Sequence, residues 1–239
     1  MKILAIAAAL ACAAGLSAEV QKKDVDIQAP DGVNLKATYF SAGRPGPAML
    51  LLHQCNMDRH AWDGLAADLA GNGFNVLTMD YRGFGESGGA KATGPSAARQ
   101  KWPADVDAAF AYLTKQKGVD QSRIAVGGAS CGVTQSSDLA ARHHEIRALM
   151  ILSGMASEPA KAYIASNAAL PVFGAASEED TGAAEGIKEA VAASKNQKSV
   201  IKIYAGAEHG VPMFAKNPEL EPMIVAWLKA QLPATGGTH

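Results

Sequence analysis

The sequence predicts an α/β protein built on one mostly parallel sheet with helices on both faces. Short apolar runs, typical of buried strands, alternate along the chain with stretches whose apolar residues recur at helical spacing. Several residues with potentially catalytic side chains come just after these apolar runs: His53, Ser130, Asp180 and His209. In parallel sheets, binding and catalytic sites form at the carboxyl ends of the strands, which is where these residues are expected to lie. A net charge of −1 and the lack of any basic run argue against nucleic acid or an anionic membrane surface as a partner.

The first 18 residues have the composition of a secretory signal peptide. Lys2 supplies an early positive charge, an apolar, alanine-rich stretch follows, and the small residues 15–18 precede Glu19. The apolar stretch is short for a transmembrane helix, so no membrane span is expected in the mature protein. We therefore expect cleavage after Ala18, a periplasmic or secreted location, and a single domain over residues 19–239.

The first half of this domain is expected to contain an antiparallel hairpin, two further strands and two helices. In the hairpin, apolar and polar residues alternate on both sides of Pro30-Asp31-Gly32. Continuous apolar runs predict the strands, and apolar residues three or four apart predict the helices. In chain order, the later elements are strand 48–52, helix 62–70 closed by Gly71-Asn72-Gly73, strand 74–79, and helix 106–113 with Pro103 near its first turn.

The second half continues the same alternation. Its strands are again continuous apolar runs, and its last helix is amphipathic. In chain order, the elements are strand 124–126, helix 133–144, strand 146–152, strand 170–175, helix 187–191, strand 200–204 and helix 220–231.

Around Ser130 the sequence changes from strand to helix within a few residues. Gly128-Ala129-Ser130-Cys131-Gly132 fits the pattern G-x-S-x-G, whose sharp turn projects the serine hydroxyl above the sheet. Glycine is needed on either side of this turn because a Cβ there would clash as strand and helix close together. A second match, Gly85-Glu86-Ser87-Gly88-Gly89, has no strand directly before it and no helix directly after it, so we interpret it as a glycine-rich loop.

These features resemble the α/β-hydrolase family, in particular its small esterase and dienelactone-hydrolase-like members. The resemblance rests on the serine turn, on His53 after a strand, on His209 after the last strand, and on the loop Asp80-Tyr81-Arg82-Gly83-Phe84-Gly85-Glu86-Ser87. It covers nearly the whole chain after the leader. It implies the α/β-hydrolase fold with a short lid insertion at about residues 155–167, and catalysis without a metal or organic cofactor.

The resemblance also implies a catalytic triad in the chain order serine, acid, histidine. Ser130 is the expected nucleophile, and it needs a base within hydrogen-bond reach because a free hydroxyl is a poor nucleophile at neutral pH. His209 is the expected base. Asp180 is the expected acid that orients His209, with Glu179 as the alternative. Asp80 precedes the serine in the chain and is expected to be structural.

Two backbone N–H groups are expected to form the oxyanion hole. The resemblance assigns one to Cys131 and the other to the loop after strand 48–52, where many relatives have His-Gly. This chain has His53-Gln54-Cys55 instead, so Gln54 and Cys55 are alternative donors, and His53 is expected to brace the loop. If Cys55 and Cys131 both donate to one oxygen, their Cα atoms fall within disulfide range, and we hypothesise a disulfide between them; two small buried thiols are the alternative.

The function predicted from these residues is that of an exported serine hydrolase which cleaves carboxylic esters through an acyl-enzyme intermediate. The short insertion favours small or medium acyl groups. The same triad would serve a peptidase, an amidase, a thioesterase or an acyltransferase. A non-catalytic binding protein on this fold is a further alternative. Cys131 is a weaker candidate for the nucleophile because Ser130 holds the central position of the motif.

Overall fold

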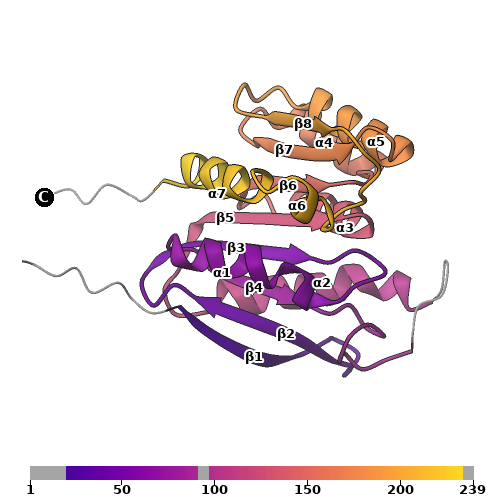
Figure 1. Cartoon of the computed structure of the whole chain (residues 1–239). Coiled ribbons are helices and arrows are strands. Elements are labelled where there is room, and N and C mark those ends of the chain that lie inside the picture. The colour runs from indigo at the N-terminus through magenta and orange to yellow at the C-terminus, as the bar shows by residue number, and fades with distance from the viewer. Residues whose placement is uncertain (1–19, 91–96, 234–239) are drawn as a thin grey trace, which may run out of the picture.

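The computed structural model describes residues 20–90 and 97–233, and within these ranges eight strands form one sheet (Figure 1). Their order is β1-β2-β4-β3-β5-β6-β7-β8. β2 is antiparallel to both β1 and β4, and every other neighbouring pair is parallel. The strands are β1 (Gln21–Gln28), β2 (Asn34–Ser41), β3 (Gly46–Leu52), β4 (Asn75–Met79), β5 (Val119–Ala129), β6 (Ile146–Leu152), β7 (Val172–Ser177) and β8 (Val200–Tyr204). The predicted fold class and its opening hairpin are confirmed.

Helices cover both faces of this sheet. The face toward the viewer in Figure 1 carries α1 (Asp63–Gly71), α6 (Met213–Lys216) and α7 (Leu220–Gln231). The opposite face carries α2 (Trp102–Thr114), α3 (Cys131–Arg142), α4 (Glu158–Ser166) and α5 (Thr181–Ala193). Two short 3₁₀ helices, η1 (Arg59–Trp62) and η2 (Arg99–Lys101), lead into α1 and α2.

Strand β3 illustrates why the central strands are apolar throughout. All of its residues are buried. Leu50 and Leu52 belong to the core beneath α2 and α3, whereas Met49 and Leu51 belong to the core beneath α1 and α7. Successive side chains of a strand point to opposite faces, so a strand covered on both sides needs an apolar residue at every position.

Several strand bounds differ from the prediction, most clearly those of β5 and β7. β5 begins at Val119, five residues before the apolar run, because residues 119–123 are half-buried or exposed and tolerate polar side chains. β7 ends at Ser177 rather than Ala175, which brings Asp180 within three residues of the strand end. The apolar run does not mark the start of β5, because the first five residues of that strand lie outside the buried core.

The segment predicted as a lid insertion, residues 155–167, consists mainly of helix α4. Ser157 caps this helix by accepting a hydrogen bond from the Ala160 N–H at 3.2 Å. Ala160 and Ile164 are fully buried in the core shared with α3 and α5, so α4 is part of the helical layer. Met155, ahead of the helix, is the large apolar side chain of this segment that is exposed, at 62%. A role for this segment in covering the site stays a prediction.

The loop after β4 is fixed by two buried ion pairs. Asp80, fully buried, accepts from the Arg59 N–H at 2.7 Å and pairs with its guanidinium at 2.5 Å. Arg82 contacts both carboxylate oxygens of Asp105, which is fully buried, and those of Asp31 nearer the surface. Burial raises the pKa of the Asp105 carboxyl, and the Arg82 guanidinium opposes that rise. These contacts agree with the structural role expected for Asp80.

Replacing Arg82 with glutamine is expected to lower the free energy of unfolding by about 3–5 kcal/mol, because the Asp105 carboxylate would stay buried without its partner. Arg142→Gln is the matched control, since its pair with Asp107 lies at the surface, and it should cost less than about 1 kcal/mol. Urea unfolding followed by tryptophan fluorescence measures both. Equal effects of the two substitutions would contradict this account of the loop.

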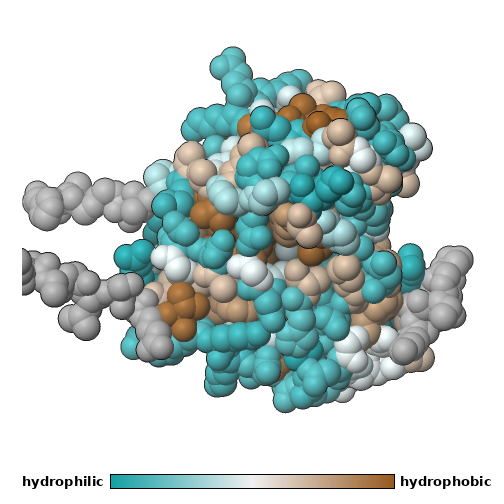
Figure 2. Space-filling view, in the orientation of Figure 1, coloured by the Kyte–Doolittle hydropathy of each residue, from teal (hydrophilic) through white to brown (hydrophobic). Residues whose placement is uncertain are grey.

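The surface seen in Figure 2 is mostly hydrophilic, with small scattered apolar areas. Among the described residues, the large apolar side chains that are exposed are Met155, Ile201 and Ile203. No helix within residues 20–90 and 97–233 is long and apolar enough to cross a membrane. The predicted signal peptide, residues 1–18, lies outside the described residues.

Candidate active site

Ser130 occupies a sharp turn between β5 and α3. Its φ of 55° and ψ of −119° are unusual for a residue other than glycine. A Cβ on Gly128 would lie 2.2 Å from the Gly132 carbonyl oxygen, and one on Gly132 would lie 2.3 Å from the Leu52 carbonyl oxygen. The Ser130 N–H donates to the Leu152 carbonyl oxygen at 2.9 Å, which ties the turn to β6. The backbone at this turn therefore has the geometry expected from the motif.

Asp180 and His209 meet at the carboxyl ends of β7 and β8. His209 Nδ1 lies 2.7 Å from Asp180 Oδ2. A carboxylate accepts only, so Nδ1 carries the proton and donates it, and Nε2 is left with its lone pair free to accept a proton. Glu179, the alternative acid, is exposed, and its backbone N–H donates to the Gly206 carbonyl oxygen at 2.9 Å. The structure thus pairs Asp180 with His209.

The loop that carries His209 packs against the residue before Ser130. A Cβ on Gly210 would lie 3.3 Å from the Cβ of Ala129. The Ser177 hydroxyl donates to the Glu208 carbonyl oxygen at 2.7 Å and ties the same loop to β7. Within the described residues, no hydrogen bond joins the Ser130 hydroxyl to His209. A hydrogen bond between a serine and its base is often longer before substrate binds. The packing of the His209 loop against the Ser130 turn is therefore compatible with such a contact.

The loop after β3 is braced by His53. Its side chain is fully buried, Nε2 accepts from the Tyr81 N–H at 3.2 Å, and Nδ1 donates to the Gln54 carbonyl oxygen at 2.7 Å. Burial lowers the pKa of the His53 imidazole, which favours the neutral form that this pair of contacts requires. His53 therefore holds this loop against the loop that follows β4, and so braces it as the sequence predicts.

The side chain of Gln54 connects this loop to the loop of His209. It is buried, and Oε1 accepts from the Val211 N–H at 2.9 Å while Nε2 donates to Asn56 Oδ1 at 2.8 Å. Gly210 has a φ of 71°, and a Cβ there would lie 2.3 Å from Gln54 Oε1. From the sequence, only the backbone N–H of Gln54 is expected to contribute to the site. The available signal was the presence of a long polar side chain where many relatives have glycine.

Replacing Gln54 with alanine is expected to lower kcat for the ester hydrolysis that the sequence predicts by about tenfold to hundredfold, because it frees the His209 loop while keeping the backbone N–H of residue 54. Asn56→Ala, which removes only the second side-chain contact, is the control and should change kcat by less than about threefold. Steady-state kinetics on both variants measure the effect. Full activity in Gln54→Ala would show that this contact does not position His209.

Cys55 and Cys131 are joined by a disulfide, with their Cα atoms 5.8 Å apart and a sequence separation of 76 residues. The hypothesis of a pair at these positions thus agrees with the structure. Cys131 is the first residue of α3, and Cys55 lies in the loop after β3. Their backbones approach each other beside Ser130, where the two oxyanion donors are expected.

Ser87, in the second G-x-S-x-G match, is occupied with backbone groups. Its hydroxyl donates to the Asp80 carbonyl oxygen and accepts from the Lys36 N–H, each at 2.8 Å. A hydroxyl held in this way has no base beside it to activate it. The interpretation of this match as a structural loop agrees with these contacts.

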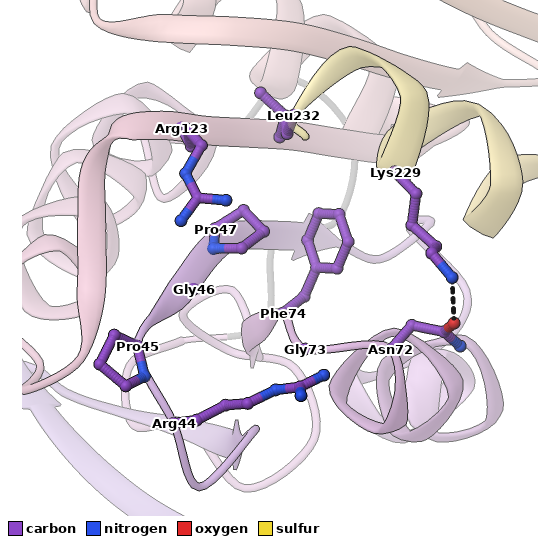
Figure 3. A pocket seen from close by; sticks show the side chains of 10 residues that line it. All are labelled: Arg44, Pro45, Gly46, Pro47, Asn72, Gly73, Phe74, Arg123, Lys229 and Leu232. Atoms are coloured by element: carbon purple, nitrogen blue, oxygen red, sulfur yellow. Dashed lines mark hydrogen bonds between the residues drawn. The ribbon is translucent and has the colours of Figure 1, made fainter. Parts of the chain in front are cut away.

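A cavity of about 310 Å³ lies at the opposite end of the sheet (Figure 3). The side chains of Arg44, Arg123 and Lys229 surround the Phe74 ring, and Lys229 Nζ donates to Asn72 Oδ1 at 2.9 Å. Its lining contains no serine, cysteine or histidine. Within the described ranges, no group of three or more histidine, cysteine or acidic side chains is arranged to hold a metal ion.

Comparison with known proteins gives matches across most of the chain. The family model of the α/β hydrolase fold matches residues 47–175. Two proteins of Mycobacterium tuberculosis, both described as uncharacterized, are 38% identical over 120 residues. That match covers 49% of this chain and 41% of each relative, so the chain aligns with less than half of their length.

Solved structures share the fold over nearly the whole chain. The esterase Pf2001 of Pyrococcus furiosus has a TM-score of 0.71 at 21% identity, covering 89% of this chain and 92% of its own. The α/β hydrolase GrgF from Penicillium sp. has a TM-score of 0.72 at 16% identity, covering 89% and 99%. A candidate dienelactone hydrolase from Klebsiella pneumoniae has a TM-score of 0.63 at 17% identity, covering 88% and 98%. At these identities the likeness concerns the fold.

Proposed function

Because the chain belongs to the α/β-hydrolase fold family, we propose that it is an exported serine hydrolase that cleaves carboxylic esters. The observation that carries the proposal is the 2.7 Å contact between His209 Nδ1 and Asp180 Oδ2, in a loop packed against the strained turn of Ser130. Fold alone never fixes an activity, so the proposal rests on these side chains.

In the first half of the reaction, Ser130 Oγ attacks the carbonyl carbon of the ester while His209 Nε2 takes the hydroxyl proton. The carbonyl oxygen becomes an oxyanion, and Asp180 stabilises the imidazolium that forms. Collapse of the tetrahedral intermediate breaks the bond to the alkoxy oxygen, which leaves as the alcohol with the proton from His209. The acyl group remains on Ser130.

In the second half, a water molecule repeats these steps on the acyl-enzyme. His209 Nε2 takes one proton from the water, and its oxygen attacks the acyl carbon. Collapse of the second intermediate returns that proton to Ser130 Oγ and releases the carboxylic acid. The reaction consumes one ester and one water and restores the enzyme.

Both intermediates need hydrogen-bond donors for the oxyanion. We assign them to the backbone N–H groups of Cys131 and of Cys55 or Gln54. Cys131 begins α3, whose N-terminal N–H groups and dipole favour negative charge. Within the described part of the chain, none of these three N–H groups donates a hydrogen bond to a backbone or side-chain oxygen, which supports the assignment.

Small or medium acyl groups are the proposed substrates. Helix α4 lies in the helical layer rather than across the strand ends, so little of the described chain covers the site. Met155 is an exposed apolar side chain beside Gly154, where a Cβ would lie 2.5 Å from the Ser130 carbonyl oxygen. It is therefore well placed to contact an acyl chain.

Export is proposed from the composition of residues 1–18, and the Cys55–Cys131 disulfide supports an oxidising compartment.

The alternative activities would use the same site. A peptidase, an amidase, a thioesterase or an acyltransferase would each use the same triad. A non-catalytic binding protein would retain the fold without turnover.

The direct test is a panel of p-nitrophenyl esters with acyl chains of increasing length, together with a peptide anilide and an acyl thioester. We expect the highest kcat/KM for short acyl esters and a burst of about one p-nitrophenol per protein as the acyl-enzyme accumulates. A preference for the anilide or the thioester would favour those alternatives. The absence of turnover on the whole panel would favour the binding protein.

A further inference from the structure

We infer that the Cys55–Cys131 disulfide positions the oxyanion hole, so that its thiol–disulfide state sets the rate of turnover. The inference rests on the proposed function. The bond joins the first residue of α3, directly after Ser130, to the loop that supplies the second proposed donor. It therefore links the two backbone segments on which the oxyanion depends.

The two ends of the bond are held very differently. Cys131 is anchored by the first turn of α3 and by the pairing of β5 with β3, in which Gly128 is opposite Leu52. Cys55 lies in a loop whose internal backbone hydrogen bond runs from the Met57 N–H to the Gln54 carbonyl oxygen at 3.0 Å. His53 and the Gln54 side chain hold the start of this loop, and the disulfide ties Cys55 itself to the rigid first turn of α3.

The expected effect on catalysis follows from the geometry that oxyanion stabilisation requires. A donor acts only when it lies within hydrogen-bond distance of the position that the oxyanion will occupy. Removing one such donor lowers kcat by about 10²–10³-fold. Displacing a donor is expected to lower kcat by a smaller factor. Substrate binding before the reaction makes less use of these donors, so KM should change little.

The surroundings of the bond make it reducible. Both cysteines are half-buried, and Arg99 Nη2 lies 3.4 Å from Cys55 Sγ. The guanidinium favours a thiolate on Cys55, which makes this sulfur the better leaving group. A reducing dithiol would then attack Cys131 Sγ and expel Cys55 as the thiolate. Its second thiol would displace Cys131, which leaves two protein thiols and one oxidised dithiol.

The experiment uses the full chain with Cys12→Ser, so that Cys55 and Cys131 are its only cysteines. Thiol titration under denaturing conditions gives the redox state before and after treatment with dithiothreitol. In each state, kcat and KM for p-nitrophenyl acetate are measured together with inhibition by phenylboronic acid, whose tetrahedral adduct places an oxygen in the oxyanion hole. Circular dichroism monitors the fold.

On reduction we expect kcat to fall by about tenfold to hundredfold and KM to stay within about twofold. Inhibition by the boronic acid should weaken in parallel, and reoxidation should restore both. The variant Cys55→Ser/Cys131→Ser should have the kcat of the reduced enzyme and show no response to dithiothreitol. Arg99→Gln should be reduced about threefold more slowly.

If the reduced protein had two free thiols and an unchanged kcat, the inference would be overturned and the proposed function would stand. Loss of the circular dichroism signal together with activity would also overturn it, because the bond would then act through stability alone. Absence of any esterase activity in the oxidised protein would overturn the proposed function and this inference together.

Discussion

Replacing Ser130 with alanine is expected to lower kcat/KM for ester hydrolysis by about 10⁴-fold or more, because alanine has no hydroxyl to attack the ester. The residual rate would come from binding and from the oxyanion donors. The substitution removes one half-buried oxygen atom and leaves the backbone turn in place. We therefore expect unchanged circular dichroism and a thermal midpoint close to that of the wild type.

Ser87→Ala is the matched control because it removes the hydroxyl of the second G-x-S-x-G match. That hydroxyl bridges Asp80 and Lys36, so its loss should lower the free energy of unfolding by about 1 kcal/mol. Its kcat/KM should stay within a few-fold of the wild type. If Ser87→Ala were inactive and Ser130→Ala active, the two motifs would have been assigned to the wrong roles.

Replacing Asp180 with asparagine is expected to lower kcat by about 10⁴-fold. Asparagine keeps the shape of the side chain but can present an N–H to His209, which favours the wrong tautomer and removes the charge that stabilises the imidazolium. The substitution therefore tests the 2.7 Å contact with His209 Nδ1 directly. Kinetics with p-nitrophenyl acetate, corrected for background hydrolysis, measure the loss.

Glu179→Gln is the control for this experiment. Glu179 is adjacent in the chain and was the alternative acid, but its side chain is exposed. Its substitution should change kcat by less than about threefold. If Glu179→Gln had a much lower kcat and Asp180→Asn stayed active, Glu179 would be the acid that orients His209.

Much of the fold was predictable because the central strands are buried on both faces. Continuous apolar runs such as Ala48–Leu52 mark such strands without help from tertiary structure. The turn at Ser130 was also predictable, because only glycine fits at 128 and 132 where strand and helix close together. Local sequence determines both features.

The features that the sequence did not reveal depend on tertiary contacts. The Gln54 side chain reaches Val211, 157 positions along the chain, and nothing near Gln54 indicates that direction. The pairing of Arg82 with Asp31 and Asp105 likewise joins three separate segments. The burial of Ala160 and Ile164 depends on how α4 meets α3 and α5, so their contribution to the core was not evident from a short insertion.

The Cys55–Cys131 pair was only partly predictable from the sequence. A resemblance placed both residues near one oxygen, but the direction of each side chain decides whether a bond can form. In the structure the Cα atoms are 5.8 Å apart and the two sulfurs are bonded. Thiol titration of the unreduced protein would detect this pair without any assumption about function.

The measurement that tests the central claim most directly is labelling with a fluorophosphonate probe, followed by intact mass and peptide mapping of the wild type, Ser130→Ala and Ser87→Ala. We predict one adduct per chain in the wild type and in Ser87→Ala, located on Ser130, and none in Ser130→Ala. An adduct that persists in Ser130→Ala, or a wild type that forms none, would contradict the proposal that Ser130 is an activated nucleophile.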